Sequence, residues 1–257
     1  MFSCTEKPDL DMYLKAYLLM KSKLLKIGKQ YFEGITSLIF PHFCVVCGSE
    51  LNQKTEHLCF SCEEELHYTY FEKYEDYSIA DQVFWGRLNI ENVFALLYYE
   101  AGTSTKKILH HIKYSEGVDL AHFMGKMLAR KLKNNPKFAD IEVLLPVPIH
   151  SKKKFSRGYN QSLLIAKGVS EELGIPILDV LYRKRHDKSQ TRKSKEERYE
   201  NVKDKFALKK GALLGVKHVM IIDDVLTTGA TLEFAARAVF EDDKNVKVSL
   251  GTLAVAH

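Results

Sequence analysis

The stretch VMIIDDVLTTGAT, residues 219–231, joins four apolar residues to two adjacent aspartates and then to a turn of small, hydroxylated residues. A short apolar run bounded by a turn is typical of a buried β-strand. The residues from 230 to 242 have the spacing of a helix. In parallel sheets whose strands are connected by helices, ligands bind at the carboxyl ends of the strands. We therefore expect Asp223 and Asp224 to lie at a ligand-binding edge.

The turn after the acidic pair has the composition of a phosphate-binding site. Successive backbone N–H groups at the start of a helix point toward one place, the helix dipole adds positive potential, and Gly229 allows a ligand to approach closely. Threonine hydroxyls add further donors. The phosphate-binding residues would be Thr227, Thr228, Gly229, Ala230 and Thr231.

The acidic pair itself suits a sugar or a metal ion. Carboxylates accept hydrogen bonds from sugar hydroxyls, and they hold Mg²⁺ through water. Each half of the stretch alone also has a structural explanation, since Asp-Asp often follows a strand and Thr-Gly-x-Thr often caps a helix. The two halves together are more specific, and they predict a site for a phosphorylated ribose. The stretch is not a Walker loop, because Gly-Lys-Ser/Thr is absent from the turn.

Apolar runs and helical spacing alternate along the rest of the chain. The expected strands are 93–99, 141–148, 218–224 and 246–256, and the expected helices are 103–133, 159–173 and 230–242. Strands that are apolar throughout and alternate with helices favour a mostly parallel sheet covered on both faces. The sequence therefore predicts an α/β fold.

A second motif, CVVCGSELNQKTEHLCFSC at residues 44–62, holds two Cys-x-x-Cys pairs separated by eleven residues. Two such turns bring four thiolates to one tetrahedral Zn²⁺ at about 2.3 Å, and Gly48 suits the tight turn. Four thiolates leave no position for water, so the zinc would be structural. The expected ligands are Cys44, Cys47, Cys59 and Cys62. The alternatives are unliganded or redox-paired thiols, and a ligand role for His42 or His57.

Length and composition set the remaining bounds. The chain has 257 residues, of which 46% are hydrophobic, and this content allows a substantial core in one to two domains. Its formal net charge of +5 permits a phosphate-bearing partner without requiring one. No apolar run reaches the roughly 20 residues of a membrane span, and AYLLM near the start is too short for a signal peptide core. We expect a cytoplasmic protein.

Three segments are expected along the chain. Residues 1–35 have the spacing of an amphipathic helical extension, and Met12 and Met20 leave the true start open. Residues 36–85 would form the four-cysteine module and a linker rich in aromatic and acidic residues. Residues 86–257 would form the α/β domain.

Two further stretches narrow the interpretation. PVPIHSKKKFSRGYNQS, residues 146–162, follows an expected strand and carries Lys152, Lys153, Lys154 and Arg157. Downstream, SQTRKSKEERYENVKDKFAL, residues 189–208, contains Gln190, Arg198, Asn201 and Phe206. Residues 219–231 resemble the signature of the type I phosphoribosyltransferases, which bind 5-phosphoribosyl 1-pyrophosphate. With the four-cysteine motif and YYEAGTSTKKILHHIKY at residues 98–114, the chain resembles, over about residues 36–257, the ComF family of bacterial competence-associated proteins.

The resemblance implies a type I phosphoribosyltransferase-like fold preceded by a small zinc-ribbon-like module. It implies association with the uptake of single-stranded DNA in natural transformation. The implied ligand is 5-phosphoribosyl 1-pyrophosphate or a similar ribose phosphate, bound with Mg²⁺. Asp223 and Asp224 would then be the catalytic pair, and Lys154 and Arg157 would lie in the pyrophosphate loop.

The stretch 183–210 holds twelve Lys or Arg against five Asp or Glu. By analogy to the family, it would be a flexible flap, including Arg183, Lys184 and Arg185, that closes over pyrophosphate and excludes water. The alternatives are a docking surface for the phosphates of single-stranded DNA and a solvated loop without a partner.

The expected function is that of a ComF-like protein with a phosphoribosyltransferase domain, and a transferase is the favoured activity. No short motif identifies an acceptor base. Tyr98, Tyr99 and Tyr114 are candidates for an acceptor pocket, although aromatic residues in such places more often belong to a core. The alternatives are a non-catalytic adaptor that binds a helicase-like partner and single-stranded DNA, and a metabolite sensor without turnover.

Overall fold

The computed structural model describes residues 42–51, 57–100, 102–114, 117–133, 135–184 and 206–256. These residues fall into two compact units, one ending at Cys59 and the other beginning at Phe60. The expected N-terminal helix, Arg185 and most of the expected flap lie outside the described residues. The boundaries of the three predicted segments stay predictions.

The first unit contains a short hairpin around the first Cys-x-x-Cys pair. Strands β1 (His42–Phe43) and β2 (Glu50–Leu51) pair antiparallel. Between them, the Cys44 N–H donates to the Ser49 carbonyl at 2.8 Å, and the Gly48 N–H donates to the Cys44 carbonyl at 2.9 Å. Gly48 has a φ of 76°, a left-handed conformation that glycine adopts without strain.

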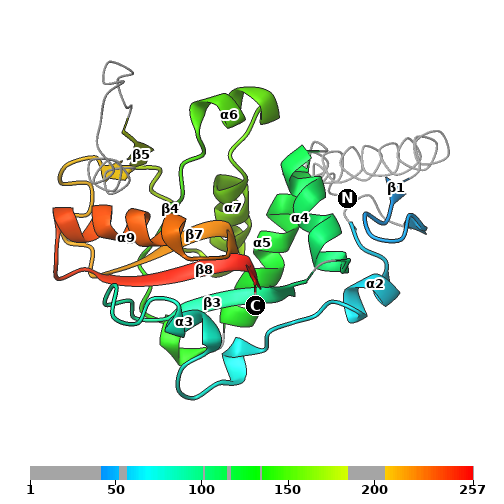
Figure 1. The fold of residues 1–257 in the computed structure, drawn as a ribbon, viewed down its shortest axis with the longest axis horizontal. Helices are drawn as coiled ribbons and strands as arrows, with labels where there is room; N and C mark the ends of the chain where they lie inside the picture. The colour runs from blue at the N-terminus through cyan, green and yellow to red at the C-terminus, as the bar shows by residue number, and fades with distance from the viewer. Residues whose placement is uncertain are drawn as a thin grey trace, which may run out of the picture. The chain divides into compact units, whose positions relative to one another are not determined.

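The second unit is built on a parallel sheet (Figure 1). Its strands are β3 (Val93–Tyr99), β4 (Val143–Pro146), β7 (His218–Leu226) and β8 (Lys247–Ala256). Their order is β3-β8-β7-β4, and every neighbouring pair is parallel. The strands are buried along almost their whole length, because helices cover both faces. The predicted parallel α/β sheet is thus confirmed.

Along the chain, the helices of the second unit lie before and between the strands of the sheet. They are α2 (Phe60–Glu64), η1 (Phe71–Lys73), α3 (Ile79–Gln82), α4 (Ser104–Tyr114), α5 (Val118–Leu132), η2 (Pro136–Phe138), α6 (Ser151–Arg157), α7 (Gln161–Leu173) and α9 (Ala230–Asp242). Figure 1 shows α5 and α7 on one face of the sheet and α9 on the other. Antiparallel β5 (Leu181–Arg183) and β6 (Phe206–Leu208) form a separate small sheet.

Two glycines allow α5 and α7 to pack closely. A Cβ on Gly125 of α5 would lie 2.2 Å from the carbonyl oxygen of Ile165, and a Cβ on Gly168 of α7 would lie 2.1 Å from that of His122. Any side chain at either position would push the helices apart. This contact fixes α7 against α5.

The structure changes two of the expected elements. The stretch 103–133, expected to be helical, holds the two helices α4 and α5, and Gly117 stands immediately before α5. Strand β7 continues past the acidic pair to Leu226, because Val225 and Leu226 still pair with β8. Among the described residues, no helix has the length and hydropathy required to cross a membrane.

Candidate functional site

The acidic pair lies near the carboxyl end of β7, in the middle of the sheet. Asp223 and Asp224 are 7% and 5% exposed. Buried carboxylates are costly unless donors or cations compensate them. Their surroundings therefore indicate what the site holds.

The start of α7 supplies a partner for Asp223. The Ser162 hydroxyl donates to Asp223 Oδ1 at 2.8 Å, and the Asp224 N–H donates to the same oxygen at 2.9 Å. Asn160 caps the helix, because its Oδ1 accepts from the Ser162 N–H at 3.2 Å. The Asn160 amide also donates to the Val147 carbonyl at 3.0 Å and so ties the helix start to the segment after β4.

Asp224 has a cation and an amide as partners. Lys113 Nζ, at the end of α4, lies 3.0 Å from Asp224 Oδ2, and its side chain is 24% exposed. Gln161 Nε2, in the first residue of α7, donates to the same oxygen at 3.3 Å. The two carboxylates are thus held by two helices that meet at the end of the strand.

Tyr159 connects these two helices. Its hydroxyl donates to the Ile112 carbonyl at 2.7 Å and accepts from the Gly117 N–H at 3.0 Å. The end of α4, which carries Lys113, is therefore tied to the residue just before the cap of α7.

The environment of Asp223 changes its acidity. Burial raises the pKa of the Asp223 carboxyl to about 7, and the neighbouring Asp224 carboxylate adds to the rise. The hydrogen bonds from the Asp224 N–H and Ser162 and the charge of Lys113 act in the opposite direction. The carboxyl therefore titrates near neutral pH, and a bound cation would favour its charged form.

The turn after β7 requires glycine. Gly229 has a φ of 76° and precedes α9 as its cap, without a side-chain cap hydrogen bond. A Cβ there would lie 2.8 Å from Val83 Cγ1 and 3.1 Å from the Phe84 ring. Arg87 donates to the Thr228 carbonyl at 3.1 Å. Val83, Phe84 and Arg87 therefore hold the backbone of the turn, while its threonine side chains are exposed.

A cavity of about 420 Å³ lies over the acidic pair. Basic side chains from α4, α6 and β5 line it together with Asp223 and Asp224, and these are Lys113, Lys153, Arg157 and Arg183. Acceptors at one part of the cavity and cations at another suit a ligand with both hydroxyl and anionic groups.

The cavity brings together predicted residues from distant parts of the chain. It is lined by Asp223 and Asp224 of β7, Arg157 of α6, Arg183 of β5 and Thr231 of α9. The other predicted phosphate-binding residues, Thr227, Thr228, Gly229 and Ala230, form the turn and the first residue of α9.

The basic residues differ in detail from the prediction. Lys154 and Arg157, which were expected in a loop, belong to helix α6. Lys153 lines the cavity where Lys154 was expected. Lys184 is exposed at the end of β5.

Sequence reasoning did not identify Lys113, Gln161 and Ser162 as site residues. Gln161 and Ser162 open a helix that follows an expected strand, and polar residues at such a helix start are a usable signal. Lys113 gives no such signal, because its helix also carries Lys106 and Lys107.

Helix α6 forms an exposed rim beside the cavity. None of its residues is buried, and Phe155 is 93% exposed. The Arg157 guanidinium lies 5.2 Å from the ring centroid of Tyr114, which is 67% exposed. The rim therefore combines lysines with accessible aromatic rings.

Arg183 is held by the backbone around the cavity. Its Nε donates to the Pro148 carbonyl at 2.8 Å, and its guanidinium lies 4.6 Å from the Phe206 ring centroid. Burial lowers the pKa of the Arg183 guanidinium, while Asp223 favours its charged form. The side chain is thus positioned as a fixed cation of the cavity.

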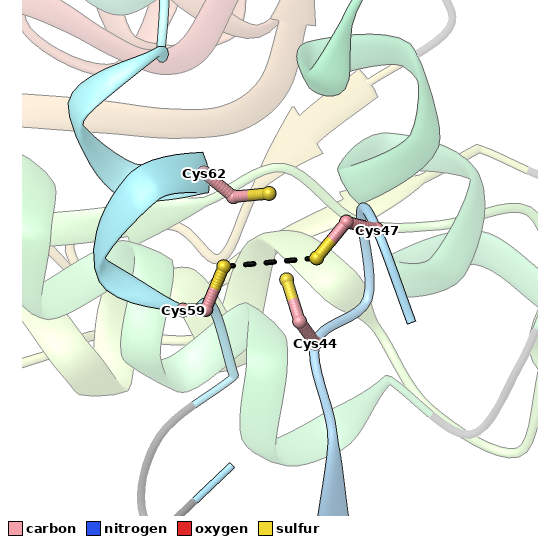
Figure 2. A group of neighbouring side chains, drawn as sticks. All are labelled: Cys44, Cys47, Cys59 and Cys62. Carbon is pink, nitrogen blue, oxygen red and sulfur yellow. Dashed lines mark hydrogen bonds between the residues drawn. The ribbon is translucent and has the colours of Figure 1, made fainter. Parts of the chain in front are cut away.

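The four predicted zinc ligands converge. Their sulfur atoms all lie within 4.8 Å of one another, and Figure 2 shows the four side chains pointing toward a common centre. The sulfurs of Cys47 and Cys59 are 3.6 Å apart. A tetrahedral Zn²⁺ with bonds of about 2.3 Å needs sulfurs roughly 3.8 Å apart, so this donor set fits the ion. Neither His42 nor His57 belongs to the group that the described residues form.

Comparison with known proteins supports the phosphoribosyltransferase-like fold of the second unit. The family described as "Phosphoribosyl transferase domain" matches residues 160–254, which include α7, the acidic pair and the glycine turn. Competence protein F of Haemophilus influenzae is 26% identical over 198 residues, which is 75% of this chain and 76% of that protein.

Two other relatives match over about half of their own length. Competence protein ComFC of Bacillus subtilis is 34% identical over 111 residues, 43% of each chain. The DNA utilization protein YhgH of Salmonella typhimurium is 27% identical over 131 residues, 49% of this chain and 56% of that protein. With the parallel sheet and the four-cysteine cluster, these matches support the predicted ComF family of competence-associated proteins, with a phosphoribosyltransferase-like domain.

Proposed function

We propose that the cavity binds 5-phosphoribosyl 1-pyrophosphate, or a closely related ribose phosphate, together with Mg²⁺. The observation that carries the proposal is the buried pair Asp223 and Asp224, which shares one cavity with basic side chains and with the start of α9. Hydroxyl groups would bind the carboxylates, and phosphate groups would bind the basic side chains and the turn.

The carboxylates also fit the metal. Mg²⁺ prefers oxygen ligands and keeps several of its waters, so Asp223 and Asp224 would hold it directly or through water. When bound, the ion would neutralise charge on the pyrophosphate. Binding of the phosphate groups and stabilisation of the leaving group would depend on the protein's own side chains.

The favoured activity is phosphoribosyl transfer. In this reaction the bond between ribose C1 and pyrophosphate oxygen breaks, pyrophosphate leaves with the electron pair, and an acceptor forms the new bond at C1 and loses a proton. Lys153, Arg157 and Arg183 would stabilise the charge of the leaving group. Binding without release of pyrophosphate, across a panel of bases, would favour the metabolite sensor instead.

Calorimetric titration with 5-phosphoribosyl 1-pyrophosphate and Mg²⁺ tests the proposal. We expect micromolar affinity, about −8 kcal/mol, for the unaltered protein and its loss in the double variant Asp223→Asn/Asp224→Asn. The control is Asp242→Asn/Asp243→Asn, an adjacent acidic pair at the other end of α9. Equal affinity in both double variants would refute the assignment.

The biological setting follows from the family. Relatives are named for competence and for DNA utilization, which supports a role of this chain in DNA uptake. A structural Zn²⁺ on the four cysteines and a helicase-like partner at that module remain part of this proposal. The cytoplasm is the compartment that we propose for this role.

The exposed rim at α6 favours a second candidate function, the binding of single-stranded DNA. Phe155 and Tyr114 offer stacking surfaces, and the adjacent lysines offer contacts for phosphates. Fluorescence anisotropy with a labelled oligonucleotide should give an affinity that falls steeply with salt. The variant Lys152→Ala/Lys154→Ala should reduce that slope by about one to two. The control Lys217→Ala/Lys244→Ala, two exposed lysines outside α6 and the stretch 183–210, should not. Salt-insensitive binding would contradict a role in phosphate contact.

A further inference from the structure

The side-chain oxygen of Gln161 is a buried hydrogen-bond acceptor without a donor among the described residues. The side chain is 8% exposed and lines the cavity, and its Oε1 has no hydrogen-bond partner among the described residues. A buried polar atom left without a partner costs on the order of 1–3 kcal/mol. Such an atom in a cavity wall therefore indicates a group that the cavity is built to receive.

The orientation of the amide follows from its neighbour. Gln161 Nε2 donates to Asp224 Oδ2, an oxygen that Lys113 also contacts. The reversed amide would place Oε1 against this carboxylate, where two acceptors would repel each other. The chemistry of the pair therefore leaves Oε1, and not Nε2, as the open position.

The missing partner must be a hydrogen-bond donor. Phosphate oxygens of an ionised ligand accept hydrogen bonds and cannot satisfy an amide oxygen, whereas a hydroxyl both donates and accepts. A hydroxyl next to Gln161 would also lie near Asp224, because the two side chains are joined by a hydrogen bond. Water would satisfy Oε1 as well, but a preference for ribose over a deoxy sugar would then not depend on Gln161.

We propose that Gln161 Oε1 accepts a hydrogen bond from one hydroxyl of the ribose diol and makes the cavity selective for ribose over deoxyribose. This inference rests on the proposed function, since it assigns a selectivity to the same cavity. A site built to hydrogen-bond a substrate hydroxyl rejects the analogue that lacks it, because the buried acceptor is then left unpaired.

The test compares ribose 5-phosphate with its 2-deoxy and 3-deoxy analogues by calorimetry, in the unaltered protein and in Gln161→Met. We expect one deoxy sugar to bind the unaltered protein about 10- to 100-fold more weakly than ribose 5-phosphate. That ratio should fall about tenfold in Gln161→Met, because the variant no longer has the acceptor. The control Lys167→Met, on the exposed face of the same helix, should keep the ratio unchanged.

The outcomes separate this inference from the proposed function. Equal binding of all three sugars to the unaltered protein would overturn the inference and the contact of the hydroxyls with the carboxylates, and it would leave only the phosphate contacts of the proposed function standing. A ratio that stays unchanged in Gln161→Met would overturn the inference and leave the proposed function standing. The inference would also fail if Gln161→Met bound every sugar equally more weakly and depended less on Mg²⁺, because Gln161 would then be a metal ligand. Failure of the unaltered protein to bind both ribose 5-phosphate and 5-phosphoribosyl 1-pyrophosphate would overturn both. If Gln161→Met does not fold, Gln161→Asn withdraws the acceptor while keeping the amide.

Discussion

At the scale of single residues, the site is a buried pair of carboxylates whose charge is only partly compensated. Asp224 has Lys113 as a cation, while Asp223 has neutral donors and a pKa raised to about 7. Below about pH 7, Asp223 of the ligand-free protein is therefore expected to hold a proton that a bound cation would displace. Both stability and binding should depend on pH near neutrality.

The pH dependence of stability has a defined sign. The pKa of Asp223 is higher in the folded protein than its ordinary value of 3.8, so the folded state binds the proton more tightly than the unfolded chain. The free energy of unfolding should therefore fall as pH rises from about 4 to about 7, by on the order of 4 kcal/mol at most. Asp223→Asn should remove this part of the dependence in urea unfolding, while Asp242→Asn keeps it. Parallel curves for Asp223→Asn and the unaltered protein would contradict the shifted pKa.

Lys113 gives a second prediction at this scale. Lys113→Met leaves Asp224 buried with only the Gln161 amide as partner, and it should lower the free energy of unfolding by about 2 kcal/mol. Lys106→Met, an exposed lysine of the same helix, should change it by less than about 0.5 kcal/mol. The cost of Lys113→Met should largely disappear in an Asp224→Asn background. An identical cost in both backgrounds would show that the pair is not coupled.

The same residues show which parts of the site could be predicted from the sequence. Asp223 and Asp224 were predictable, because a polar pair at the end of an apolar strand marks the edge where α/β sheets bind ligands. The partnership of Lys113 with Asp224 was not, because it depends on where α4 ends against β7, and no local pattern encodes that distance. The open acceptor of Gln161 likewise appears only when every donor around it is placed.

At the scale of elements, the helix starts and the tight turns position the site. Asn160 fixes the start of α7, and Gly229 fixes the turn into α9. The four strands of the parallel sheet and the longer helices α4, α5, α7 and α9 were predictable, because each strand is apolar throughout and the helices have a clear spacing. The short strands and helices were not predicted. The division of 103–133 into two helices could not be predicted, because the helical spacing continues across the interruption between Tyr114 and Val118.

The turn into α9 can be tested with two glycines. Gly229→Ala meets both a left-handed φ and side chains of Val83 and Phe84 within 3.1 Å, so it should lower the free energy of unfolding by about 3 kcal/mol. Gly211→Ala has a similar φ of 71° but meets only the flexible Leu214 side chain, and it should cost about 1 kcal/mol. Chemical denaturation measures both. Equal costs would show that the contact with Val83 and Phe84 does not constrain the turn.

At the scale of the whole molecule, the chain combines a cavity over the acidic pair with a four-cysteine cluster. The sequence predicted both, because their residues are concentrated in short motifs. It could not predict which basic side chains reach the cavity, because α6 and β5 acquire their places only through tertiary contacts.

The cluster predicts about one Zn²⁺ per chain. Chelation or Cys44→Ser should release the metal and loosen the hairpin of β1 and β2, whereas Cys4→Ser, outside the four, should leave the metal content unchanged. Elemental analysis and hydrogen exchange measure the two effects. A folded, metal-free chain with an ordered hairpin would contradict a structural zinc.

The most direct test of the central claim is the phosphorus NMR spectrum of 5-phosphoribosyl 1-pyrophosphate with Mg²⁺ during titration with the protein. The proposed function predicts that the resonances of both the 5-phosphate and the pyrophosphate shift or broaden with the unaltered protein. It also predicts that they stay unchanged with Asp223→Asn/Asp224→Asn. Resonances that the unaltered protein leaves unperturbed would show that the cavity does not bind this ligand.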